Sequence, residues 1–136
     1  MNRARFAALS LAAMLLLGAG ACGSDDVPAS PVSSESVGTS ADPVPADEAL
    51  DRIADGARVI DVRTPEEFDA GHLDGAINLD VQEGDFAERV SELPRDASYV
   101  VYCASGRRAT GAVEQMAELG FSDVLNGGGY ADLVQE

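Results

Sequence analysis

One segment restricts the fold of this chain more than any other. Residues 99–102 read Tyr-Val-Val-Tyr, a run without a charged or amide side chain to face water. Such a continuous run is typical of a strand at the centre of a parallel sheet, where helices cover both faces. Helical spacing of apolar residues begins soon afterwards at Ala109 and ends at Gly120. The segment therefore predicts an α/β domain with a buried central strand.

The same alternation of helix and strand signals extends over residues 44–136. Apolar spacing predicts helices at 46–53, 65–70, 86–93 and 109–119, and strands at 58–62, 76–79, 98–103 and 123–125. Thr64 and Pro65 form a helix start signal, because Thr is a favoured N-cap and Pro suits the first helical position. The glycines at 127–129 are expected to form a turn before a short terminal helix. The pattern predicts a doubly wound domain with a mainly parallel sheet of about five strands.

Residues 1–21 have the composition of an export signal. Arg3 and Arg5 precede an apolar stretch, and small residues occupy positions 18–21. Cys22 follows directly, and the order Ala-Gly-Ala-Cys at 19–22 resembles a bacterial lipoprotein signal, in which the cysteine is lipidated and becomes the new N-terminus. Such signals usually have Leu where this chain has Ala19. Ordinary cleavage that leaves Cys22 free is therefore the alternative.

Residues 22–43 form a second zone, rich in Pro and Ser and without Leu, Ile or an aromatic side chain. They cannot bury enough apolar surface to offset the entropy lost on ordering, so we predict a flexible tether. A lipid on Cys22 would then anchor the exported domain, residues 44–136, to the extracytoplasmic face of the bacterial cell envelope.

Charge and composition exclude several classes of function. Nine basic residues, all of them Arg, stand against 24 acidic residues, giving a net charge of −15. The chain has no basic stripe to bind nucleic acid, and an anionic membrane would repel it, so a lipid and not a basic patch must hold it there. One His and two Cys cannot build a multi-cysteine zinc site.

The chemistry is concentrated in the loop after the central strand. Cys103 is expected between that strand and a helix N-terminus, where backbone N–H groups and the helix dipole favour a thiolate or a bound anion. Such a cysteine is expected to act as a nucleophile. Gly106 lets the loop curl tightly, and Ser105 can donate through its hydroxyl. Arg107 and Arg108 can present forked donors to an oxyanion.

Several motifs, in this order, resemble those of the rhodanese family. They are Asp61-Val62-Arg63, Glu67-Phe68, the run Gly71-His72-Leu73-Asp74-Gly75-Ala76-Ile77-Asn78-Leu79, and the loop from Cys103 to Arg108. The spacing is Cys-x4-Arg, whereas the related dual-specificity phosphatases and arsenate reductases have Cys-x5-Arg. The 3-mercaptopyruvate enzymes have a loop without two arginines, so thiosulfate or a small persulfide is the preferred donor.

The resemblance implies a sulfurtransferase. Rhodaneses carry a sulfane sulfur as a cysteine persulfide, taken commonly from thiosulfate and handed to cyanide or a thiol. Cys103 is then the expected sulfur carrier, and the cycle is expected to need neither a metal nor an organic cofactor, because the persulfide itself carries the sulfur. The loop amides would cradle the outer sulfur, and Arg107 or Arg108 would bind the sulfonate of thiosulfate. The expected substrate-binding residues are Ala104, Ser105, Gly106, Arg107 and Arg108.

Three residues outside the loop have smaller expected roles. Asp61 and Arg63 follow a strand at the edge where α/β sites gather. We expect Arg63 to pair with Glu66 or Glu67, and Asp61 could instead orient the active loop. His72 is expected to pack and hydrogen-bond in a turn, because attack by a preformed thiolate needs no base.

Three alternatives stay open. The fold could serve as a non-catalytic binding module, or as a redox or persulfide sensor that presents Cys103 to a membrane partner, because fold alone does not fix function. A thiol oxidoreductase would need a resolving thiol from another molecule. A disulfide between Cys22 and Cys103 would tie the tether across the loop. Turnover with thiosulfate separates a sulfurtransferase from a binding module.

Overall fold

A computed structural model describes residues 38–135, and it contains one sheet of five strands. The strands are β1 (Ser40–Pro43), β2 (Arg58–Asp61), β3 (Ile77–Asn78), β4 (Tyr99–Cys103) and β5 (Val124–Gly129). Their order is β1-β5-β4-β2-β3, and every neighbouring pair runs parallel. β4 is the central strand and is buried at every position. The predicted parallel sheet with a buried centre is confirmed.

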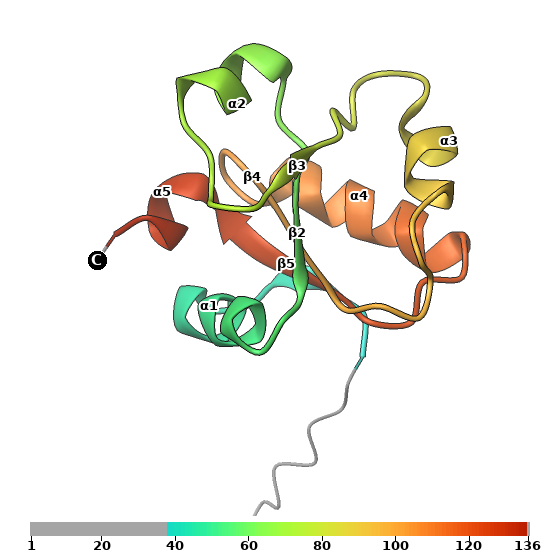
Figure 1. Cartoon of the computed structure of the whole chain (residues 1–136), viewed down its shortest axis with the longest axis horizontal. Helices are drawn as coiled ribbons and strands as arrows, with labels where there is room; N and C mark the ends of the chain where they lie inside the picture. The colour runs from blue at the N-terminus through green and yellow to red at the C-terminus, as the bar shows by residue number, and fades with distance from the viewer. Residues whose placement is uncertain (1–37, 136) are drawn as a thin grey trace, which may run out of the picture. The chain divides into compact units, whose positions relative to one another are not determined.

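Helices cover both faces of this sheet (Figure 1). α1 (Ala46–Ala54) and α5 (Tyr130–Leu133) pack on one face, and α3 (Phe86–Ser91) and α4 (Arg107–Glu118) pack on the other. Alternate residues of β4 therefore enter two different apolar clusters. Tyr102 belongs to the cluster under α1, whereas Val101 and Cys103 belong to the cluster under α4. The domain is doubly wound, as predicted.

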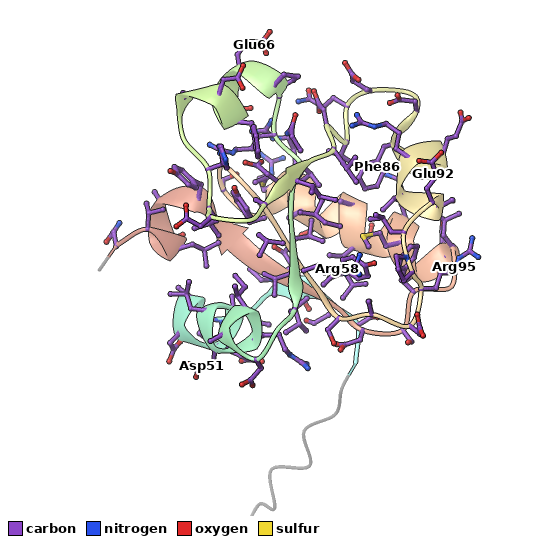
Figure 2. The ribbon with its side chains drawn as sticks, in the orientation of Figure 1. Asp51, Arg58, Glu66, Phe86, Glu92 and Arg95 are labelled. Carbon is purple, nitrogen blue, oxygen red and sulfur yellow. The ribbon has the colours of Figure 1, made fainter. Side chains whose placement is uncertain are left out.

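α2 (Pro65–Ala70) follows β2 and begins with a reciprocal cap. Thr64 Oγ1 accepts a hydrogen bond from the Glu67 N–H at 3.3 Å, and Glu67 Oε2 accepts one from the Thr64 N–H at 3.1 Å. This capping box satisfies two backbone donors that a helix start would otherwise leave unpaired. Figure 2 shows Glu66 pointing outward from α2, whereas Phe86 of α3 points into the interior.

The first strand corrects the predicted end of the tether. β1 lies inside the range 22–43 and pairs in parallel with β5. The domain therefore begins before residue 44. Composition did not reveal this strand, because it is held by backbone hydrogen bonds to β5 and not by a row of apolar side chains.

The glycines at 127–129 belong to β5 and do not form the predicted turn. A Cβ on Gly127 would lie 2.8 Å from Val100 Cγ1, so only glycine lets β5 pack this closely against β4. Residues 1–21, Cys22 and most of the predicted tether lie outside the described residues. Within residues 38–135 no helix is long and apolar enough to span a membrane, and no cluster of His, Cys, Asp and Glu could hold a metal ion.

Candidate active site

Cys103 is the last residue of β4, and its thiol lies beneath the loop that leads into α4. The residue has no exposed surface. The Gly106 N–H donates to Cys103 Sγ at 3.0 Å. Gly106 is the N-cap of the twelve-residue helix α4 and has a φ of +84°, a conformation that favours glycine. The strand, the tight loop and the helix start therefore place the sulfur at a helix N-terminus, as the sequence predicts.

The cysteine loop, residues 103–108, packs against glycines of β5. A Cβ on Gly106 would lie 3.3 Å from both Gly128 Cα and Pro43 Cγ. A Cβ on Gly129 would lie 3.0 Å from the Ala104 carbonyl oxygen. The loop thus rests directly on the backbone of β5, with no room for side chains. The outer side of the loop is open, because Ala104 and Ser105 are exposed.

The two loop arginines have different surroundings. Arg108 donates to Glu67 Oε2 at 2.8 Å and to Glu67 Oε1 at 2.9 Å, a bidentate pair that joins α4 to α2. Arg107 is exposed and has no ion-pair partner among residues 38–135. A carboxylate therefore already occupies the fork of Arg108, whereas the guanidinium of Arg107 is available to an anion.

The ion pair between Arg108 and Glu67 also shifts the pKa of both side chains. The hydrogen bonds from Arg108 lower the pKa of Glu67 from 4.5 to about 2, against an opposing effect of burial. The hydrogen bonds to Glu67 raise the pKa of Arg108, and burial again opposes the shift. Both groups are charged at neutral pH, so the contact between α2 and α4 is a true ion pair.

Asp61 and Arg63 form a second, buried ion pair beside the site. Arg63 Nε donates to both carboxylate oxygens of Asp61 at 3.0 Å, and an Nη of Arg63 donates to Asp61 Oδ2 at 2.7 Å. The same Nη donates to the Gly71 carbonyl at 2.6 Å. The guanidinium lies 4.3 Å from the centre of the Tyr130 ring. Arg63 therefore connects β2, the end of α2 and α5.

The predicted pairing of Arg63 with Glu66 or Glu67 is wrong. Asp61 has no exposed surface, and a buried carboxylate needs a buried counterion, which Arg63 supplies from two residues further along the chain. Glu67 is occupied by Arg108 instead. In the described part of the chain, each side-chain donor to the Asp61 carboxylate belongs to Arg63 and none to the cysteine loop.

His72 is exposed and contacts its own turn. Its ring stacks on Phe68 with the centroids 3.7 Å apart, and its Nδ1 lies 2.9 Å from the Phe68 carbonyl oxygen. These contacts match the predicted packing and hydrogen-bonding role.

Asn126 is a site residue that sequence reasoning missed. It is buried in β5, and its side-chain amide donates to the carbonyl oxygen of Gly106 at 3.1 Å. The predicted strand stopped at Leu125, one residue short of it. The sequence did contain a signal for it. Asn126 directly follows a strand that is expected to be buried, and a buried amide side chain needs hydrogen-bond partners in the neighbouring structure.

Comparison with known proteins gives a consistent result. The family model described as "Rhodanese-like domain" matches residues 45–135. The thiosulfate sulfurtransferase PspE of Escherichia coli is 38% identical over 76 residues, which are 54% of this chain and 71% of that protein. The thiosulfate sulfurtransferase GlpE of Pseudomonas putida is 35% identical over 91 residues, which are 66% of this chain and 81% of that protein.

Solved structures show the same fold. A rhodanese-related protein from Thermoplasma volcanium has a TM-score of 0.58 and 32% identity, and the match covers 68% of this chain and 89% of that one. The structure titled "rhodanese with anions from E. coli" has a TM-score of 0.51 and 34% identity, over 60% of this chain and 95% of that one. The reduced CoADR-RHD of Bacillus anthracis matches with a TM-score of 0.55, over 64% of this chain but only 15% of the larger protein. Because a family model matches residues 45–135, including the cysteine loop, the chain belongs to the rhodanese family.

Proposed function

We propose that the protein is a sulfurtransferase that moves a sulfane sulfur from thiosulfate, through a persulfide on Cys103, to cyanide or an acceptor thiol. The observation that carries this proposal is the hydrogen bond from the Gly106 N–H to Cys103 Sγ at the N-terminus of α4. A sulfur at that place receives a hydrogen bond and the positive end of the helix dipole, and both favour an anionic nucleophile. Relatives named thiosulfate sulfurtransferase support the substrate class.

The proposed cycle has two transfers and balances without a redox partner. The Cys103 thiolate attacks the outer sulfur of thiosulfate, a sulfur–sulfur bond forms, and the bond to the sulfonate sulfur breaks. Sulfite leaves with the electron pair of the broken bond. The outer sulfur of the persulfide then passes to cyanide, which forms thiocyanate, or to a thiol, and the Cys103 thiolate returns.

The proposal gives different roles to the two arginines of the loop in this cycle. Arg107 is exposed and has no counterion in the described domain, so it would bind the sulfonate and stabilise the departing sulfite. Arg108 is held by Glu67 and would fix the position of the helix start. The backbone N–H groups from Ala104 to Arg108 would cradle the outer sulfur. Ser105 is exposed on the same loop and can add a hydroxyl donor.

The proposed location rests on the sequence. Export through the signal at residues 1–21 and lipidation of Cys22 would place the domain on the extracytoplasmic face of the cell envelope. Radiolabelled palmitate on the parent protein and none on a Cys22→Ser variant is the expected result.

Intact mass spectrometry tests the chemistry directly. The compact unit Ser33–Glu136 contains β1 and Cys103 but not Cys22, so any change in its mass reports on one thiol. Thiosulfate is expected to add one sulfur, about 32 Da, and cyanide to remove it. The Cys103→Ser variant is expected to fold and to gain no mass. A folded parent protein with a free thiol whose mass no sulfane donor changes would contradict the proposal and favour a binding or sensing module.

A further inference from the structure

The side chain of Asn126 is the most fully bonded polar group in the described domain outside the ion pairs. It has no exposed surface. Its Oδ1 accepts from the Gly128 N–H at 2.9 Å. Its Nδ2 lies 2.8 Å from the Ala41 carbonyl oxygen, 3.1 Å from the Gly106 carbonyl oxygen and 3.1 Å from Thr110 Oγ1. All four partners are uncharged and lie on β1, β5, the cysteine loop and α4.

These bonds hold the residue that contacts the thiol. The Gly106 carbonyl accepts from Asn126 Nδ2, from the Thr110 N–H at 3.0 Å and from Thr110 Oγ1 at 3.3 Å. The N–H of the same glycine donates to Cys103 Sγ. The N–H and the carbonyl of Gly106 lie on the two peptide planes that meet at its Cα. Because glycine tolerates many φ and ψ values, hydrogen bonds to the carbonyl that hold one plane limit the movement of the N–H on the other. Asn126 and Thr110 provide this fixation.

The same amide brings the first strand into the site. Ala41 lies in β1, 85 residues before Asn126 in the chain. Pro43, also in β1, is one of the two groups that close the space beside Gly106. The strand β1 thus packs against the loop at Gly106, the buried residue of the loop. Arg108, the charged residue of the first turn of α4 that interacts with Cys103, is paired with Glu67 and makes no hydrogen bond to this amide.

We infer that Asn126 is a positioning residue, which orients Gly106 so that its N–H stabilises the Cys103 thiolate. The inference rests on the proposed function, because it matters only if Cys103 reacts as a thiolate. Its experiment uses alkylation and not sulfur transfer, so failure of the inference and failure of the sulfurtransferase proposal give different results.

The test compares the full chain with its Asn126→Leu and Asn78→Leu variants. Leu has nearly the shape of Asn and is neutral, so it removes the hydrogen bonds without adding charge. Asn78 is the matched control, because its Nδ2 also donates to two backbone carbonyls, of Asp61 at 3.1 Å and Arg63 at 2.9 Å, away from the loop. The rate of iodoacetamide labelling is measured against pH, and the peptide that carries Cys103 is followed by mass spectrometry.

Asn126→Leu is expected to move the midpoint of the pH–rate profile upward by about half to one pH unit. This shift corresponds to labelling that is roughly three to ten times slower near pH 7, with the same limiting rate at high pH. Asn78→Leu is expected to leave the midpoint in place even where it lowers the melting temperature. A folded Asn126→Leu protein with an unchanged midpoint, or an equal shift in the control, overturns the inference.

Asn126→Ala covers the case in which Asn126→Leu does not fold. Ala removes the amide, and with it the hydrogen bond to the Gly106 carbonyl, without adding bulk at the buried position. An upward shift of the midpoint in the folded variant supports the inference. An unchanged midpoint overturns it, because the N–H of Gly106 would then keep its place without the amide.

Discussion

The carboxylate of Glu67 accepts two hydrogen bonds from the guanidinium of Arg108, at 2.8 and 2.9 Å, across 41 residues of sequence. The same carboxylate accepts from the Thr64 N–H and so caps α2. One side chain therefore starts α2 and holds it to the first turn of α4, directly after the cysteine loop. The pair fixes where α2 lies relative to the thiol.

Glu67→Gln is expected to lower the free energy of unfolding by about 1 kcal/mol at pH 7. The value is modest because both side chains are partly exposed, 27% for Arg108 and 35% for Glu67, and solvent screens such a pair. Urea unfolding of parent and variant at equal ionic strength measures the difference. An equal effect of Arg108→Gln, with no further loss in the double variant, would identify the pair as the cause.

The effect of Glu67 depends on pH with a definite sign. Its pKa is lowered from 4.5 to about 2 in the folded state, so the stabilisation is present above about pH 4.5 and disappears as the pH falls toward 2. The difference in unfolding free energy between parent and Glu67→Gln should therefore shrink between pH 5 and pH 3. A difference that is the same at pH 7 and pH 3 would show that lost packing, and not lost charge, destabilises the variant.

Arg107→Gln is expected to weaken thiosulfate binding without weakening the fold. Arg107 is exposed, belongs to the cysteine loop, and has no ion-pair partner among residues 38–135. Loss of a charged contact to the sulfonate should raise KM by roughly tenfold, with unfolding free energy within 0.5 kcal/mol of the parent. Initial rates of thiocyanate formation measure KM. Arg58→Gln is the control, since Arg58 is also exposed but begins β2 and pairs with Tyr99, at the end of β4 opposite to Cys103. Similar KM values for both variants would contradict a specific role.

The sequence predicted the elements whose signals are local. β4 was recognised because five consecutive buried residues leave a continuous apolar run, and α2 because Thr64, Pro65 and Glu67 form a complete start signal. Cys103 and the loop were predicted because the strand, the glycine and the helix are adjacent in the chain.

The features that sequence reasoning missed depend on contacts between distant segments. β1 is a strand only because β5 lies beside it and Asn126 binds its backbone. The glycines of β5 carry no side-chain pattern. That they leave space for the cysteine loop to pack on the strand backbone is visible only in the three-dimensional structure. The pairing of Arg63 with Asp61 and not with Glu67 was missed because the burial of Asp61, which requires a buried counterion, is not visible from its position in the sequence.

Gly106→Ala is expected to destabilise the domain by more than 2 kcal/mol and to slow sulfur transfer. The φ of +84° strains any side chain, and the added Cβ would also approach the backbone of Gly128 and the ring of Pro43 at 3.3 Å. Gly75→Ala isolates the backbone strain from the crowding, because Gly75 has a similar φ of +78° but nothing within 4 Å of the new Cβ. It should cost about 1 kcal/mol and leave transfer unchanged. Equal losses of stability would show that crowding at the loop contributes nothing.

Asp61→Asn is expected to destabilise the domain by about 3 kcal/mol, because it leaves the buried Arg63 guanidinium without its counterion. The variant keeps the shape of the side chain, so packing is little changed. Urea unfolding gives the free energy, and kcat is measured at a temperature where the variant is folded. We expect kcat to change less than threefold, because the hydrogen bonds of Asp61 run to Arg63 and not to the cysteine loop. A large loss of kcat with normal stability would instead support a role of Asp61 in orienting the loop.

Removal of β1 tests whether the chain upstream of the family match is part of the working domain. The match begins at residue 45, whereas β1 ends at Pro43 and pairs with β5. A fragment of residues 45–136 loses this pairing, the hydrogen bond from Asn126 to the Ala41 carbonyl and the contact of Pro43 beside Gly106. Compared with Ser33–Glu136, it should melt at a lower temperature and react more slowly with iodoacetamide at pH 7, because a buried amide donor and an edge of β5 become exposed. Thermal unfolding and labelling of the two fragments measure both effects. Identical behaviour would mean that β1 only rests against the sheet, and the domain would then begin at the family boundary.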